Sequence, residues 1–339
     1  MRAAVVEAIG RAPAAADVPE PSRRAGEALV RIQAVALNPV ELHIWNGHFF
    51  DGPPQPPYVI GLEGIGIVEE GDRLTPGTRV RVEFVHPGYG RDGALAEYAV
   101  APEVPDAADR ASQAWVAPIG DELDDADAAA LGVPVFTAMM CLERARQAGA
   151  SLESAHVLVT GATGAVGLIA VQLARLMGAT RIVAAGRNPE RLERARSLGA
   201  DAAVELANGL GAGELRERFA EAAGGRLDVA LDPLWGVPAR AAIEALTRDG
   251  VYVSFGQAAS SLAEMSGIPM RNRRVTVVGH SGAWATPSER HAALARAHEL
   301  ARRGGRPLTL DTEQLELDEI GDAWARLSRS AGRRLVVRP

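Results

Sequence analysis

The stretch VTGATGAVG, residues 159–167, places three glycines at intervals of three residues. An apolar run leads into it and a second one follows, so the pattern predicts a strand over 156–161 and a helix over 165–177. The middle and last glycines let the backbone approach a bound pyrophosphate and let the helix pack closely on the strand. The N-terminus of such a helix offers free N–H donors to an anion.

Glycine also occurs in strand–helix turns for geometry alone, so the flanking sequence must show whether this turn belongs to a nucleotide-binding sheet. Residues 181–186 predict a second strand, and Asn188 with Pro189 predicts the cap and first turn of a helix that Gly199 ends. Further strands are expected at AAVEL, DVALD and VYVSFG, and further helices over 214–223 and 239–246. Strands that alternate with helices in this way build a parallel α/β sheet with right-handed crossovers.

The first 115 residues have a different pattern, with short apolar runs such as AAVVEA and TRVRVEF between clusters of proline and glycine. Such runs are typical of an antiparallel β domain. The tail holds a strand-like VTVVGH, a helix over 287–303 and a final LVV strand, which indicates a return to the first domain. Because 339 residues exceed one ordinary core, we expect two domains, one from 1–118 with 282–339 and one from 119–281.

The charged residues exclude several kinds of site. All 36 basic residues are arginines, which also fits GC-rich codon usage. The lack of lysine excludes a Walker-type phosphate loop, a Schiff-base lysine and the Tyr-x-x-x-Lys pair of short-chain dehydrogenases. The net charge of −7 argues against binding to nucleic acid or to an anionic membrane surface.

Cysteine content and the N-terminal sequence indicate a cytoplasmic protein. Cys141 is the single cysteine, so neither an internal disulfide nor a cysteine-rich zinc lobe is expected. The start, MRAAVVEAIG, has no apolar stretch of signal-peptide length. Residues 157–174 carry no charge and reach the lower limit for a membrane span, but the glycine turn divides them into a strand and a helix.

The end of the second strand points to the kind of dinucleotide. An NAD site places Asp or Glu there, about twenty residues after the glycine turn, to accept from the ribose 2′-hydroxyl. This chain has Gly186, Arg187 and Asn188, with Arg191 one turn later. A guanidinium binds a 2′-phosphate through paired hydrogen bonds, so we expect NADPH. The alternative is that Arg187 is an ordinary surface arginine.

With these motifs the chain resembles the medium-chain dehydrogenase/reductase superfamily over nearly its full length. The resemblance rests on VTGATGAVGLIAVQLARLMGA, RNPERLERARSLGAD, ALNPVELHIWNG, GLEGIGIVEE and DVALDP. It implies a GroES-like β domain built from both chain ends, an inserted doubly wound Rossmann domain, and an active site in the cleft between them. It also implies a homodimer, for which the VTVVGH strand is a plausible pairing edge.

Zinc-containing members of that superfamily have ligands at positions that correspond here to Asn38, Leu62 and the neighbourhood of 132–133. Asparagine is a poor zinc ligand and leucine is none, so we expect neither a catalytic nor a structural zinc. The segment Asn38-Pro39-Val40 resembles the zinc-independent quinone oxidoreductase branch, which reduces quinones or activated enones with NADPH. Members of that branch often have tyrosine where this chain has His43.

Hydride transfer to an enone leaves negative charge on a carbonyl oxygen, which neutral donors can stabilise in place of a metal. Asn38 is the candidate that orients substrate or nicotinamide, or else a turn asparagine before proline. His43 is the candidate proton source, because histidine exchanges protons near neutral pH, or else a packing residue. Trp45, Phe49 and Phe50 are candidates for an apolar substrate pocket, or else for core and loop packing.

The backbone of 254–257 is expected to hold the nicotinamide carboxamide. The full set of candidates for binding the cofactor is Thr160, Gly161, Thr163, Gly164, Ala165, Val166, Gly167, Gly186, Arg187, Asn188, Arg191, Phe255, Gly256 and Gln257. The leading hypothesis is an NADPH-dependent, zinc-independent reductase of a quinone or an α,β-unsaturated carbonyl. The alternatives are a reductase of an aldehyde, ketone or imine in a biosynthetic pathway, and an NADPH-binding protein without turnover.

Overall fold

The computed structural model describes residues 1–48, 52–105, 113–329 and 332–339. The chain divides into two compact units. The β unit consists of Met1–Val133, Thr286–Glu289 and Thr309–Pro339, and the α/β unit consists of Pro134–Ala285 and Arg290–Leu308. No helix of the described residues is long and apolar enough to cross a membrane.

The β unit contains a seven-stranded sheet in the order β15-β16-β3-β5-β6-β8, with β7 paired to β3, and a three-stranded sheet in the order β2-β1-β4. The strands are β1 (Arg2–Val6), β2 (Ala14–Asp17), β3 (Glu27–Ala36), β4 (Tyr58–Val59), β5 (Glu63–Glu70), β6 (Arg79–Glu83), β7 (Tyr98–Pro102), β8 (Trp115–Pro118), β15 (Thr312–Glu316) and β16 (Arg334–Arg338). All pairs are antiparallel except β15 with β16. The predicted antiparallel domain is therefore present.

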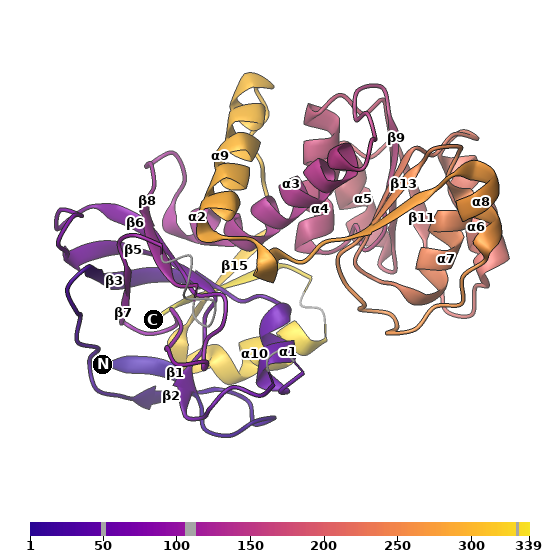
Figure 1. The fold of residues 1–339 in the computed structure, drawn as a ribbon. Coiled ribbons are helices and arrows are strands. Elements are labelled where there is room, and N and C mark those ends of the chain that lie inside the picture. The colour runs from indigo at the N-terminus through magenta and orange to yellow at the C-terminus, as the bar shows by residue number, and fades with distance from the viewer. Residues whose placement is uncertain (49–51, 106–112, 330–331) are drawn as a thin grey trace. The chain divides into compact units, whose positions relative to one another are not determined.

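The C-terminal segment returns to the β unit, as the sequence predicts. Val336 of β16 pairs with Ala36 of β3, and Val337 pairs with Val35. Figure 1 shows this return by colour, because yellow C-terminal segments lie among the indigo and purple strands. The helices of this unit are α1 (Val40–Trp45), α2 (Asp125–Ala130) and α10 (Ile320–Ser328).

The α/β unit contains one six-stranded sheet that is parallel throughout, in the order β11-β10-β9-β12-β13-β14. The strands are β9 (His156–Val159), β10 (Arg181–Gly186), β11 (Ala202–Glu205), β12 (Val229–Asp232), β13 (Val251–Ser254) and β14 (Thr276–Gly279). This is the doubly wound Rossmann order, and the predicted fold class is confirmed. The order reverses between β9 and β12, where ligands bind in open α/β sheets.

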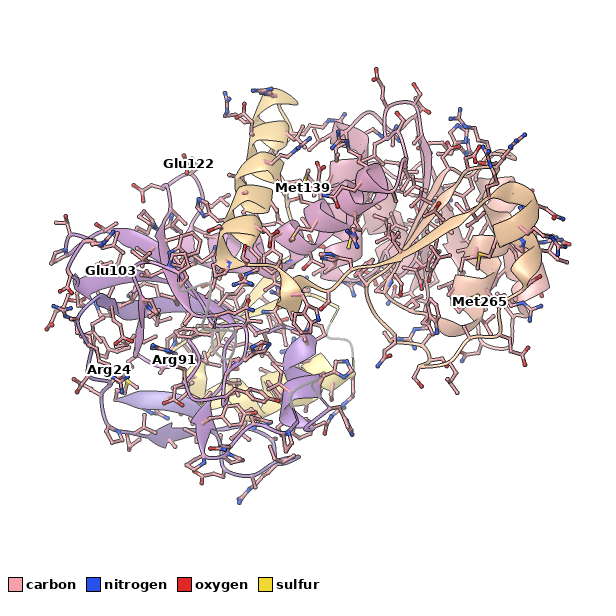
Figure 2. The ribbon with its side chains drawn as sticks, in the orientation of Figure 1. Arg24, Arg91, Glu103, Glu122, Met139 and Met265 are labelled. Atoms are coloured by element: carbon pink, nitrogen blue, oxygen red, sulfur yellow. The ribbon has the colours of Figure 1, made fainter. Side chains whose placement is uncertain are left out.

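Helices connect consecutive strands of this sheet, and further helices precede β9 and follow β14 in the chain. They are α3 (Gly132–Gln147), α4 (Ala165–Leu176), α5 (Pro189–Ser197), α6 (Ala212–Ala222), α7 (Gly236–Ala245), α8 (Gly267–Arg273) and α9 (Pro287–Arg303). Asn188 caps α5 as predicted, since its side-chain oxygen accepts from the N–H of Arg191. Of the methionines labelled in Figure 2, Met139 is fully buried on α3 and Met265 packs against the core around β12 and β13.

The two units differ from the predicted domain boundaries in two segments. Helix α2 belongs to the β unit, because its buried alanines pack against Ala34, Ala36 and Ile65. Most of α9 belongs to the α/β unit, where the fully buried Arg290 donates to the carbonyl of Ala285 and Arg296 pairs with Glu143 of α3 at 3.1 Å. These packing contacts assign the two segments to their units.

Candidate functional site

The glycine turn after β9 leaves no room for side chains at two of its three glycines. Gly161 has a φ of +59°, which side-chain-bearing residues rarely adopt, and a Cβ there would stand 2.7 Å from Cγ of Pro233. A Cβ on Gly167 would stand 2.4 Å from the carbonyl oxygen of Gly161. These two positions therefore require glycine for packing, because backbone meets backbone or a proline ring there.

Gly164 differs from the other two glycines because it is exposed and a Cβ there would meet only one neighbour. It is the N-cap of α4, with φ −91° and ψ 164°, and makes no side-chain capping bond. A Cβ on Gly164 would have a single neighbour within 4 Å, the carbonyl oxygen of Gly161 at 3.3 Å. The first N–H groups of a helix have no partner within the helix, so α4 offers donors and a partial positive charge at a point that the backbone keeps accessible.

The end of β10 lies directly against this turn. A Cβ on Gly186, the last residue of the strand, would stand 2.5 Å from Cγ2 of Thr163. Arg187 follows and is exposed, and within the described part of the chain it has no ion-pair partner. The structure thus brings together Thr163, Gly186 and Arg187, three of the predicted cofactor-binding residues. Thr160, in contrast, is fully buried, and its hydroxyl donates to Asp232.

A cavity of about 450 Å³ lies at the ends of β13 and β14. It is lined by Ser254, Phe255, Gly256, Gln257, Gly279, His280, Ser281 and Trp284. The predicted residues of the 254–257 segment are therefore in one cavity with His280 and Trp284, which the sequence reasoning did not select. The position of His280 in the sequence could have indicated its place in the cavity. It directly follows a strand of the parallel sheet, so it lies at the same sheet edge as residues 254–257.

His280 brings an imidazole ring to this cavity. Among the described residues its Nε2 is buried without a hydrogen-bond partner. Burial lowers the pKa of His280, and the neighbouring positive charge of Arg144 lowers it further. The imidazole is therefore held neutral, which lets one ring nitrogen donate and the other accept.

Asn38 is buried in the β unit, and both polar atoms of its amide are bonded within the protein. Its Nδ2 donates to the carbonyl of Ala36 at 3.0 Å, and its Oδ1 accepts from Nη2 of Arg334 at 2.7 Å. Its backbone N–H donates to the carboxylate of Glu41 at 2.7 Å. These bonds hold the turn between β3 and α1, and the predicted role of Asn38 toward substrate stays a prediction.

Two arginines and two glutamates surround Asn38, Leu62 and residues 132–133, the positions at which the family resemblance predicts the zinc ligands of zinc-containing members. Glu63, next to Leu62, accepts from Arg81 at 2.8 Å, from Arg334 at 3.5 Å and from the N–H of Val133 at 2.9 Å. A Cβ on Gly132 would overlap this ion pair. The described residues contain no group of three or more His, Cys, Asp or Glu that could hold a metal ion.

Burial dominates the protonation of both glutamates in this cluster. It raises the pKa of Glu63, which Arg81 and Arg334 oppose, and it raises the pKa of Glu41 to about 7 against the hydrogen bonds from Asn38 and Gly61. The guanidinium groups of Arg81 and Arg334 face the Glu63 carboxyl as ion-pair partners. The cluster therefore presents paired charges in place of a ligand set open to a cation.

Among the aromatic candidates of the β unit, Trp45 has the contacts of a packing residue. It lies edge-on to Trp324, with ring centroids 5.8 Å apart, and its indole N–H donates to the carbonyl of Arg11 at 2.5 Å. His43, the candidate proton source, is exposed on α1. Phe49 and Phe50 lie outside the described residues.

Two family models match the chain. Residues 24–107 match the alcohol dehydrogenase GroES-like domain, and residues 165–303 match the zinc-binding dehydrogenase model. The first confirms the GroES-like character of the β unit, and the second covers the parallel sheet from α4 onward. Together they match the two kinds of domain that the sequence predicts.

Several curated proteins are similar to parts of the chain. The quinone oxidoreductase of Lama guanicoe is 37% identical over 164 residues, 47% of this chain and 44% of that protein. The putative quinone oxidoreductase YhfP of Bacillus subtilis is 34% identical over 150 residues, 44% of this chain and 42% of that protein. An alcohol dehydrogenase of Geobacillus stearothermophilus is 31% identical over 232 residues, 60% of this chain and 63% of that protein. The chain thus spans between 42% and 63% of these curated relatives.

Solved structures match over the whole chain. The quinone oxidoreductase of Thermus thermophilus, also crystallised in complex with NADPH, has a TM-score of 0.75 and 29% identity, with 100% of both chains covered. The structure of AibC has a TM-score of 0.81 at 24% identity, with 100% of this chain and 96% of that chain covered, and shows the shared fold.

The packing of the glycine turn predicts that its glycines respond differently to a methyl group. Gly167→Ala is expected to lower the free energy of unfolding by about 1–3 kcal/mol, because the new Cβ has no space. Gly164→Ala is expected to cost less, about 0.5 kcal/mol, because its Cβ would meet a single atom within 4 Å, the carbonyl oxygen of Gly161 at 3.3 Å. Urea denaturation of both variants measures the difference, and equal losses would contradict the packing argument.

Proposed function

We propose that this chain, which belongs to the medium-chain dehydrogenase/reductase superfamily and has quinone oxidoreductase-like relatives, is an NADPH-dependent oxidoreductase that transfers a hydride to a quinone or an α,β-unsaturated carbonyl without zinc. The observation that carries the proposal is the junction of β9, α4 and β10. There an open glycine N-cap lies beside a strand end that presents Arg187 in place of a carboxylate.

The residues at this junction fit a phosphorylated dinucleotide. Gly164 leaves space at the N-terminus of α4 that a side chain would fill, and this is where a pyrophosphate would bind. Arg187 is exposed and available to a 2′-phosphate, whereas a carboxylate at that place would repel it. The complex of the Thermus thermophilus quinone oxidoreductase with NADPH supports the same choice of nucleotide.

When bound, NADPH supplies the hydride. The remaining chemistry falls to residues of the chain, which must orient the acceptor and stabilise the negative charge that develops on its oxygen. We propose that Phe255, Gly256 and Gln257 hold the carboxamide end of the nucleotide through backbone groups. We further propose that Asn38 orients the reacting groups and that His43 delivers the proton that completes the reduction.

The charges around Asn38 and Glu63 support zinc-free chemistry. The guanidinium of Arg334 bonds to Asn38, and that of Arg81 bonds to Glu63. A divalent cation at this place would meet two fixed positive charges and no thiolate or imidazole ligand among the residues of this cluster. We therefore propose that neutral hydrogen-bond donors perform the role that zinc has in alcohol dehydrogenases.

Two other functions use the same nucleotide site. A reductase of an aldehyde, ketone or imine needs only a different acceptor, and a nucleotide-binding protein without turnover needs none. The quinone oxidoreductases among the relatives favour the quinone or enone acceptor. The alcohol dehydrogenases among them keep the carbonyl acceptor as the second candidate.

The acceptor class can be tested with EDTA-treated protein. NADPH oxidation is followed with a simple quinone, an enone and an aliphatic aldehyde, and product analysis identifies the reduced bond. We expect reduction of the quinone carbonyls or of the C=C bond of the enone, without added metal. Turnover confined to the aldehyde would support the second candidate, activity that requires added zinc would overturn the mechanism, and tight NADPH binding without oxidation would support a non-catalytic role.

Arg187 provides the test of nucleotide choice. Arg187→Ala is expected to weaken NADPH binding by about ten- to a hundredfold and to change NADH binding by less than about twofold, because only NADPH has the 2′-phosphate. Titration of nucleotide fluorescence measures both constants. Arg196→Ala, at an exposed arginine of α5 that pairs with Glu193, is the control and should leave both unchanged.

We also propose a homodimer that forms through β14. This strand ends the parallel sheet, so one row of its backbone groups has no partner strand in the described part of the α/β unit. Val277 of this strand is 39% exposed, and Ile268 of α8, the helix that precedes the strand in the chain, is 58% exposed. Antiparallel pairing with the β14 of a second copy would satisfy the backbone groups and cover this apolar surface.

Light scattering after size-exclusion chromatography tests the dimer. Val277→Asp is expected to shift the protein to monomer, because two like charges would meet across the paired strands. Val237→Asp, at an exposed valine on α7, is the control and should leave the mass unchanged. A monomeric wild type, or a dimer that survives Val277→Asp, would exclude this interface.

A further inference from the structure

The carboxylate of Asp232 is fully buried at the end of β12, where the sheet order reverses. The hydroxyl of Thr160 donates to its Oδ1. Its Oδ2 accepts from the hydroxyl of Tyr252 at 2.5 Å and from the N–H of Trp235 at 2.7 Å. Because β12 lies between β9 and β13, these donors come from three neighbouring segments of the sheet.

The three donors account for the burial of a charge that has no cation beside it. Asp232 forms no ion pair within the described residues. A buried carboxylate is stable only when hydrogen bonds replace its hydration, and bonds to a charged acceptor are stronger than neutral ones. Burial raises the pKa of Tyr252, and the adjacent Asp232 raises it further, so the phenol stays a donor. Loss of any one donor leaves part of the charge unsatisfied.

The bonds to Asp232 determine where two loops begin. Thr160 directly precedes Gly161, and its N–H also donates to the carbonyl of Leu231 at 3.0 Å. Trp235 is the N-cap of α7 with φ 60° and ψ −165°, a conformation that costs a bulky residue about 1–3 kcal/mol. Its N–H bond to Asp232 holds it there. The structure therefore keeps a strained residue in place through the same carboxylate that binds Thr160.

Pro233 lies between these loops and leaves them little freedom. A Cβ on Gly161 would stand 2.7 Å from Cγ of Pro233, and a Cβ on Gly256 would stand 2.6 Å from its carbonyl oxygen. The same carbonyl accepts from Ala258 at 3.0 Å. A shift of the loop after β12 would therefore displace both the glycine turn and the loop after β13.

We propose that Asp232 and Thr160 are positioning residues that hold the 161–167 turn in the orientation in which its N–H groups bind the nucleotide pyrophosphate. The inference deepens the proposed function and rests on it for the identity of the nucleotide. Thr160 acts through the turn, because its buried side chain cannot contact a ligand. Asp232 acts through Thr160 in the same way.

The hydroxyl donors to Asp232 link it to different parts of the sheet, so variants that each remove one donor can be compared. Thr160 connects the carboxylate to the glycine turn, whereas Tyr252 connects it to β13 within the core. Thr160→Val and Tyr252→Phe each remove one hydroxyl and keep the shape of the side chain. Thr160→Ser keeps the hydroxyl. A role limited to stability would give Thr160→Val and Tyr252→Phe the same effects.

Two measurements on the full chain test the proposal: amide hydrogen exchange over 160–168 and the Kd for NADPH. Thr160→Val is expected to speed exchange in this segment and to raise the Kd about five- to twentyfold. Thr160→Ser should stay within about twofold of wild type in both, because its hydroxyl still donates to Asp232. Tyr252→Phe should lower the thermal midpoint as Thr160→Val does, with exchange and Kd within about twofold of wild type.

The outcomes separate this inference from the proposed function. If the wild type does not bind NADPH, the proposed function fails, and the exchange over 160–168 still decides whether Thr160 positions the turn. The inference is overturned if Thr160→Val leaves this exchange unchanged, or if Tyr252→Phe speeds it equally. If the wild type binds NADPH, the inference is also overturned when the Kd of Thr160→Val equals that of the wild type.

Discussion

No side chain fits between the end of β9 and the first turn of α4, and the carboxyl edge of the parallel sheet depends on this constraint. A Cβ on Gly167 would stand 2.4 Å from the carbonyl oxygen of Gly161, and one on Gly186 would stand 2.5 Å from Thr163. Because the glycines allow these close approaches, the N-terminus of α4 packs directly against the ends of β9 and β10. Gly164 is the exposed glycine of the three, and a Cβ there would meet only the carbonyl oxygen of Gly161, so it is the point at which a phosphate group can reach the helix.

The two units stabilise buried carboxylates in different ways. In the α/β unit, two hydroxyl groups and one backbone N–H satisfy Asp232, and the carboxylate joins two loops to β13. In the β unit, guanidinium groups pair with Glu63. The first arrangement fixes geometry at a surface that would bind an anion. The second brings positive charge to the positions at which the family resemblance predicts zinc ligands in zinc-containing members, and this is why we propose a metal-free mechanism.

Local rules predicted much of the fold. The spacing of the glycines at 161, 164 and 167 and the apolar runs around them predicted β9, the turn and α4 within about two residues, because a strand, a turn and a helix cap each depend on near neighbours. Helices α2 and α9 were assigned to different domains from those in the structure, since their membership depends on packing partners. Trp45 has the contacts of a core residue, and a pattern of aromatic residues cannot distinguish a core from a pocket.

By itself, the sequence determined the order of strands and helices, the glycine turn, the cap at Asn188 and the presence of Arg187 at the end of β10. These features depend on residues close to one another in the sequence, so they can be predicted without knowledge of the tertiary structure. Only the tertiary structure decided that Arg334 bonds to Asn38, 296 residues away, that His280 shares a cavity with Phe255, and that Asp232 joins Thr160 to Tyr252. Such pairings depend on strand order and burial. A buried polar group needs a hydrogen-bond partner, and the packing of the sheet determines which partners lie within bonding distance.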